Sequence, residues 1–122
     1  QVFVFDDFPM DSQVALLRHS LAHYPELTGM AEATMKAYLA RNLAALWRIQ
    51  EDSAARYPEI AAHHADFVKR ILHDRNVVMA FRMQRQLRKG GTFVAIGALH
   101  LYGRKGVLAL LVEDGWKVAR VY

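Results

Sequence analysis

The chain of 122 residues is long enough for one domain with a single hydrophobic core. Apolar residues make up 53% of it and charged residues 23%, a balance that excludes an intrinsically disordered chain. There is no cysteine, which excludes disulfides and thiolate metal sites. The net charge is +4, and the basic excess falls in residues 69–122. A solvated cationic face is the favoured interpretation, and nucleic acid is not an expected partner because no nucleic-acid-binding module accompanies the charge.

No apolar run approaches the roughly 20 residues that a membrane helix needs, so no membrane span is expected. The chain starts at Gln1 and runs directly into an apolar stretch, residues 2–5, without an initiator methionine or a leader. We therefore expect a fragment of a longer protein, with any targeting signal upstream. The location of that longer protein stays open, and an extracytoplasmic or membrane-associated one is compatible with the sequence.

Apolar residues recur at helical spacing through most of the chain before Gly90. The pattern predicts helices over residues 9–24, 27–38, 43–55 and 58–89. Pro9 is well placed at a helix start, and Pro25 ends the first stripe. The last segment is either one long helix or two helices broken near Asp74, and Gly90 follows it as a helix stop.

The segment after the two glycines is β-branched and apolar on both faces, as in a strand buried on both sides. We predict strands at Thr92–Ala98 and Trp116–Tyr122, separated by a loop and by a short helix, Val107–Glu113. The expected fold class is a helix-rich α/β single domain over residues 1–122, with a helical region at 1–90 and a parallel strand–helix–strand unit at 91–122. An unpaired edge at Thr92–Ala98 would allow self-association as a homo-oligomer.

The loop Gly97–Gly106 is the most informative segment. It holds a Gly-x-x-His motif, and the order of elements predicts that His100 lies where a buried strand ends, a usual position for ligand-binding residues. Gly103 and Gly106 allow tight turns before the short helix, whose N-terminus could receive an anion or a polarised carbonyl. His100 is a candidate metal ligand or general base, and the alternative is an ordinary hydrogen-bonded histidine.

A polar triplet, Asp74-Arg75-Asn76, interrupts the long basic helix. The simplest interpretation is a helix junction with a salt bridge. The functional alternative is that Arg75 and Asn76 orient a ligand beside the loop, with Arg75 the more direct of the two.

The other histidines are weaker candidates. His19 and His23 have the i, i+4 spacing that can hold zinc, but they lack the intervening glutamate, so the metal interpretation is not favoured. His63 and His64 are adjacent and cannot share one helical face. For His73, next to Asp74, a structural role is favoured. The chain has no P-loop, no dinucleotide fingerprint and no Ser-His-Asp order.

Residues 66–122, from FVKRILHDRN to the C-terminus, resemble the C-terminal end of the TraB/GumN family. An acidic-Arg-Asn motif and the Gly-Ala-x-His-Leu-x-Gly-x-x-Gly run carry the resemblance. Upstream, FPMDSQVALL and AYLARNLAALW resemble the helical middle of that family, so the likeness covers the whole chain. Two positions depart from the pattern: Asp74 stands where Glu is commoner, and Tyr102 stands where a proline is usual.

The resemblance implies a fragment of an erythromycin-esterase/ChaN-like fold, since the family is similar to TIKI metalloproteases and more distantly to haem-binding ChaN-like lipoproteins. It implies that His100 is a metal ligand or catalytic residue, with Arg75 and Asn76 beside it. It also matches Gln1 to the end of a Glu-Thr stretch, which makes residues 2–5 the tail of a helix. A second Gly-x-x-His motif, typical of the family, is not in this chain.

The implied function is the C-terminal part of a metal-dependent hydrolase that acts on a peptide or protein, and some relatives shut down mating pheromones during plasmid conjugation. The alternative is a non-enzymatic module that binds a peptide or haem. Because a catalytic metal normally takes three protein ligands, His100 alone should hold no metal stably, and we expect this chain by itself to be inactive and metal-free.

Overall fold

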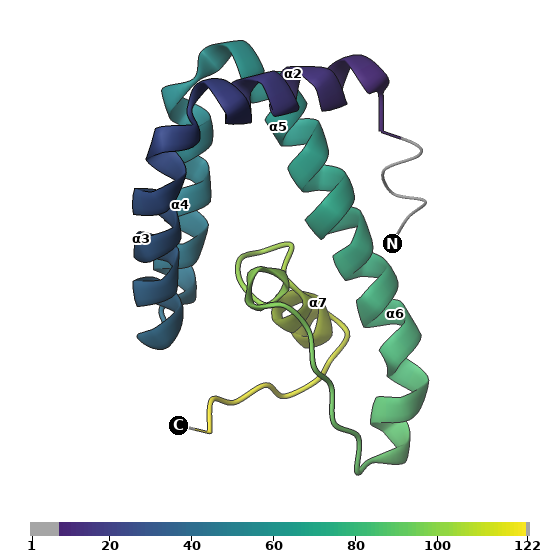
Figure 1. Cartoon of the computed structure of the whole chain (residues 1–122). Helices are drawn as coiled ribbons and strands as arrows, with labels where there is room; N and C mark the ends of the chain where they lie inside the picture. Colours follow the sequence, from purple (N-terminus) through teal and green to yellow (C-terminus); the bar gives the residue numbers. More distant parts are fainter. Residues whose placement is uncertain (1–7, 122) are drawn as a thin grey trace. The chain divides into compact units, whose positions relative to one another are not determined.

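A computed structural model describes residues 8–121 of the chain (Figure 1). Its contacts divide the chain into two compact units, Gln1–Ile71 and Leu72–Tyr122. The division falls inside a π-helical segment, η3 (Lys69–His73). The two regions predicted from the sequence met at residue 90, whereas the two compact units meet nearly twenty residues earlier. Gln1 and the apolar stretch at residues 2–5 lie outside the described residues.

In the first unit, apolar periodicity and proline punctuation correctly predicted the helices. They are α2 (Met10–Ala22), α3 (Leu27–Leu39), α4 (Leu43–Arg56) and α5 (Ala61–Val68), with 3₁₀ turns η1 (Tyr24–Glu26) and η2 (Pro58–Ile60). Both turns contain a proline in their first two positions, where its missing N–H breaks no helical hydrogen bond. Each turn therefore separates two α-helices instead of extending one of them.

The helices of the first unit surround a small apolar core. Phe8, Leu46 and Ile60 are all less than 10% exposed, and the Phe8 ring meets the Phe67 ring edge-on at 5.7 Å. Helices α3 and α4 lie side by side, joined by a tight connection at residues 40–42 (Figure 1). There the Asn42 side chain caps α4 by accepting a hydrogen bond from the Ala45 amide at 3.0 Å.

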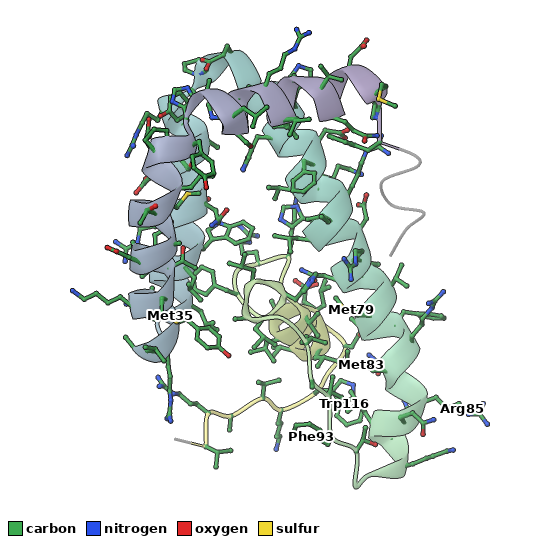
Figure 2. All side chains as sticks on the ribbon, viewed as in Figure 1. Met35, Met79, Met83, Arg85, Phe93 and Trp116 are labelled. Carbon is green, nitrogen blue, oxygen red and sulfur yellow. The ribbon has the colours of Figure 1, made fainter. Side chains whose placement is uncertain are left out.

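The second unit is built on α6 (Asp74–Lys89) and α7 (Val107–Glu113), which pack against each other. Ala80 from α6 and Val107 from α7 are nearly fully buried at 3% and 2% exposure. The outer face of α6 is basic, and Figure 2 shows Arg85 projecting outward from it. The helix stop predicted at Gly90 is confirmed, because that residue follows α6 with a φ of 75° that favours glycine.

Polar side chains join the end of α7 to α6. Gly115, with φ of 90°, follows α7, and the Trp116 amide donates to the Leu111 carbonyl at 2.9 Å, as in a Schellman-type helix end. The Trp116 indole N–H donates to Gln84 Oε1 at 2.8 Å, and the Gln84 amide donates to Asp114 at 2.7 Å. These bonds fix where the chain leaves α7.

The predicted α/β fold class is wrong for the described residues, which contain helices and irregular segments but no strand. No strand forms at Thr92–Ala98 or in the described part of Trp116–Tyr122, and Ala98 belongs to the 3₁₀ turn η4 (Ala98–His100). Apolar, β-branched residues favour extended backbone, but a strand also needs a neighbouring backbone to exchange hydrogen bonds with. The first of these segments exposes apolar side chains to solvent: Phe93, labelled in Figure 2, is 90% exposed.

Two consequences follow for the expected partners. Without a sheet in residues 8–121, the sheet edge predicted to mediate self-association is not there. No helix in the described range combines the length and the apolar character that a bilayer crossing requires.

Candidate functional site

The Gly-x-x-His motif forms the 3₁₀ turn η4 in the second unit, not the exit of a strand. Gly97 precedes the turn, and its carbonyl accepts a hydrogen bond from the His100 amide at 3.0 Å. The Leu101 amide bonds the Ala98 carbonyl at 3.1 Å, which closes the turn. This local hydrogen bonding fixes the backbone of His100 without a sheet.

Two glycines shape the loop between η4 and α7. Gly103 has a φ of 84°, in the left-handed region that other residues disfavour. Gly106 is required for a different reason, since a Cβ there would lie 2.5 Å from the Tyr102 carbonyl oxygen and 2.7 Å from that of Leu101. The backbone can therefore approach the carbonyls of residues 101 and 102 just before α7 only when residue 106 has no side chain.

Asn76, in the first turns of α6, holds the loop in place. Its side chain is among the most deeply buried in the described chain, at 2% exposure. Asn76 Nδ2 donates to the Lys105 carbonyl at 2.7 Å, and Asn76 Oδ1 lies 2.6 Å from Nδ1 of His100. One side chain thus joins α6 both to the histidine and to the end of the loop.

These two bonds fix the proton on the imidazole. The Lys105 carbonyl can only accept, so the amide nitrogen of Asn76 must face it and the amide oxygen must face His100. Since that oxygen can only accept, neutral His100 carries its hydrogen on Nδ1. The lone pair is then on Nε2, the atom that could bind a metal ion or take a proton.

The electrostatic surroundings favour neutral His100. Partial burial lowers the pKa of His100 below its ordinary value, and the positive charge of Arg75 lowers it further. The imidazole therefore keeps its Nε2 lone pair at neutral pH, which both metal binding and general-base chemistry require.

The structure brings the polar triplet of α6 and the loop together within the second unit, and Asn76 makes the direct contact. The sequence favoured Arg75 for that position, but the influence of Arg75 on His100 is through its charge. Asp74 begins α6 as an acidic residue of its first turn. Gln1, the remaining candidate, lies outside the described residues, and Tyr102 lies in the loop with 40% exposure.

Sequence reasoning missed a second cluster, in the first unit. His19, His23 and Glu59 place their ligand atoms within 4.8 Å of one another. The i, i+4 spacing of the histidines is visible in the sequence, but the carboxylate comes from η2, far along the chain. No local motif signals that arrangement.

The model of the TraB/PrgY/gumN family matches residues 1–120, almost the whole chain. The chain belongs to the TraB/PrgY/gumN family. The membership inferred from the acidic-Arg-Asn and Gly-x-x-His motifs is therefore confirmed, and the family assignment extends over both compact units. No curated protein and no solved structure gives a significant match.

The family resemblance implies a divalent metal at His100, and the residues around it fit one part of such a site. Nε2 of His100 has the lone pair that a metal requires, and Nδ1 is oriented by Asn76, as the second ring nitrogen of a metal-bound histidine commonly is. Among residues 8–121, His100 belongs to no group of three candidate ligands. The described chain thus supplies one oriented ligand, and a catalytic site normally has three.

Proposed function

We propose that this member of the TraB/PrgY/gumN family is the C-terminal part of a metal-dependent hydrolase of the peptidase type. The observation that carries the proposal is the hydrogen bond from Nδ1 of His100 to Asn76, which leaves Nε2 unprotonated. A histidine oriented in this way is suited to binding a divalent ion or to moving a proton. The Arg75 charge supports the same role by favouring the neutral ring.

Each residue of the site has a distinct part in this proposal. His100 offers Nε2 as a ligand or base, Asn76 holds the ring, and Gly106 allows the loop to close against α6. A bound divalent ion would supply an activated water and polarise a carbonyl. The substrate class, a peptide or protein, follows from the family resemblance.

The proposal is tested by His100→Ala in the intact protein that contains this chain, with peptide hydrolysis and bound metal measured together. We expect kcat/KM to fall by about 10²-fold or more, because a metal ligand or general base contributes at least that much. His63→Ala, a histidine of the other unit that bonds Ser12 at 2.9 Å, is the matched control and should keep both readouts.

A folded His100→Ala protein that keeps both its hydrolysis rate and its metal content would contradict the proposal. Metal or haem retained together with peptide binding, and no hydrolysis by the wild type, would favour the non-enzymatic binding module instead.

A further inference from the structure

We propose that the first unit contains a separate site for a divalent transition-metal ion of the zinc class, formed by His19, His23 and Glu59. It is independent of the His100 site and lies in the other compact unit. The sequence predicted a metal-free chain and did not favour a metal at His19 and His23, so the proposal departs from both predictions.

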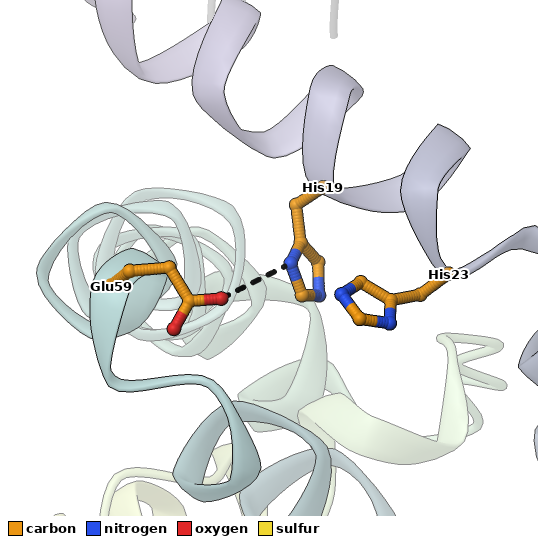
Figure 3. Close-up of side chains that lie close together, drawn as sticks. All are labelled: His19, His23 and Glu59. Carbon is orange, nitrogen blue, oxygen red and sulfur yellow. Dashed lines mark ion pairs between the residues drawn. The ribbon is translucent and has the colours of Figure 1, made fainter.

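The ligand set has the composition and position of a metal site. His19 lies in the last turn of α2, and His23 is the residue that follows the helix as its C-cap. The two imidazoles are four residues apart and lie next to each other, with ring centroids 4.5 Å apart. Glu59, from η2, places a carboxylate oxygen 3.8 Å from Nδ1 of His19 (Figure 3). The candidate ligand atoms lie within 4.8 Å of one another. Two imidazoles with one carboxylate suit zinc, cobalt, nickel or iron better than magnesium or calcium.

The separations are larger than those of a metal-bound site. With metal–ligand distances of about 2.0–2.1 Å, tetrahedral ligand atoms lie about 3.4 Å apart. To reach the separations of a metal-bound site, the ligand atoms must move by about 1 Å. Glu59 can supply this movement, because its side chain is 64% exposed and lies on a short 3₁₀ turn. His19 is the more fixed ligand, since its side chain is only 15% exposed.

A second layer of side chains orients His23. Nδ1 of His23 lies 3.0 Å from Oε1 of Glu26, so a neutral ring donates from Nδ1 and leaves Nε2 for a metal. The Tyr57 hydroxyl donates to the same carboxylate, at 2.8 and 2.7 Å from its two oxygens, and Arg56 Nη1 lies 3.4 Å from it. A carboxylate held by two further groups is a well-fixed support for the histidine.

The Tyr57 ring also fixes both imidazoles by packing. Its centroid lies 4.4 Å from that of His19 and 4.2 Å from that of His23, and the two imidazoles are 4.5 Å apart. Figure 3 shows the two imidazoles next to each other, with Glu59 on the far side of His19. Imidazoles that already lie close together lose little conformational freedom when they bind an ion, and this favours affinity.

The site has room for an exogenous ligand. Both histidines line a cavity of about 950 Å³ within the first unit, together with apolar side chains of α2 and α3. Three protein ligands leave at least one coordination position for water or another small ligand. The arrangement therefore corresponds to an open metal site and not to a closed structural one.

Titration of the whole chain with ZnCl₂ and CoCl₂, followed by calorimetry and by the visible spectrum of Co²⁺, tests the proposal. We expect about one ion per chain. His19→Ala and His23→Ala should each weaken binding by more than about 100-fold, and Glu59→Gln and Glu26→Gln by about 10- to 100-fold. His100→Gln is the matched control and should bind as the wild type does, which separates this site from the proposed hydrolase site.

No saturable binding, or binding that survives the double change His19→Ala/His23→Ala, would overturn the proposal. If the alanine variants lose their helical circular dichroism, the exposed Glu59→Gln variant and imidazole NMR of the wild type replace them. Zn²⁺ must then shift the resonances of His19 and His23 before those of the other histidines. Shifts confined to other histidines would count against the site.

Discussion

Replacing Gly106 with alanine is expected to cost about 3 kcal/mol of stability and to displace the loop that carries His100. The added Cβ would lie 2.5 Å from the Tyr102 carbonyl oxygen and 2.7 Å from that of Leu101. Both neighbours are backbone atoms, so neither can rotate away as a side chain could. Overpacking in a well-packed region costs about 1–3 kcal/mol, and backbone contacts this short put the change at the upper end.

Gly97→Ala is the matched control for that measurement. Gly97 has a φ of −63°, which any residue adopts, and an added Cβ would meet only Cδ2 of His100, at an ordinary 3.6 Å. We expect its free energy of unfolding to stay within about 1 kcal/mol of the wild type. Urea unfolding of both variants checks the pair, and equal losses at the two glycines would contradict the close approach seen at Gly106.

Asn76→Leu is expected to destabilise the second unit by about 2–3 kcal/mol and to release His100 from its fixed orientation. The leucine keeps a side chain of similar size but leaves the Lys105 carbonyl and the His100 Nδ1–H without their partner. An unsatisfied buried polar group costs about 1–3 kcal/mol. Because His100 is only partly buried, water can repair part of the loss at the ring.

Val77→Ala, next along α6 and 58% exposed, is the control for that variant and should change stability by less than about 0.5 kcal/mol. Urea unfolding measures both, and imidazole NMR measures the orientation of His100. An Asn76→Leu protein as stable as Val77→Ala would show that the two hydrogen bonds do not hold the loop.

The helices were predictable because their signals are local. Pro25 and Pro58 separate apolar stripes of helical period, and Gly90 ends α6 with a positive φ. The same stripes could not reveal the π-helical turn η3 (Lys69–His73), which lies where the two compact units divide. Period alone does not distinguish α- from π-helical hydrogen bonding over five residues.

The strand prediction was wrong because strand pairing depends on a distant part of the chain and not on local sequence. Thr92–Ala98 has the composition of a buried strand, yet pairing depends on a second backbone at the right distance, and none pairs with it among the described residues. Composition predicted neither the absence of a strand here nor the exposure of its apolar side chains, since Phe93 is 90% exposed.

The candidate site was partly predictable, through the family motifs and not through spacing. The resemblance placed the acidic-Arg-Asn triplet near the Gly-x-x-His loop, and it did not show that Asn76 would be the residue that contacts His100. In the first unit, the i, i+4 pair His19 and His23 was visible in the sequence. Glu59 could not be assigned to it, because only the packing of η2 against α2 brings the carboxylate there.

Asn76 holds His100 with its proton on Nδ1 and its lone pair on Nε2. Two-bond ¹H–¹⁵N correlation of the histidine side chains at about pH 7.5, above the ordinary histidine pKa, tests it most directly. The His100 signals are assigned as those missing in His100→Gln. We expect a protonated Nδ1 and an unprotonated Nε2 for His100, and a ring that carries its hydrogen on Nε2 would contradict the hydrogen bond to Asn76.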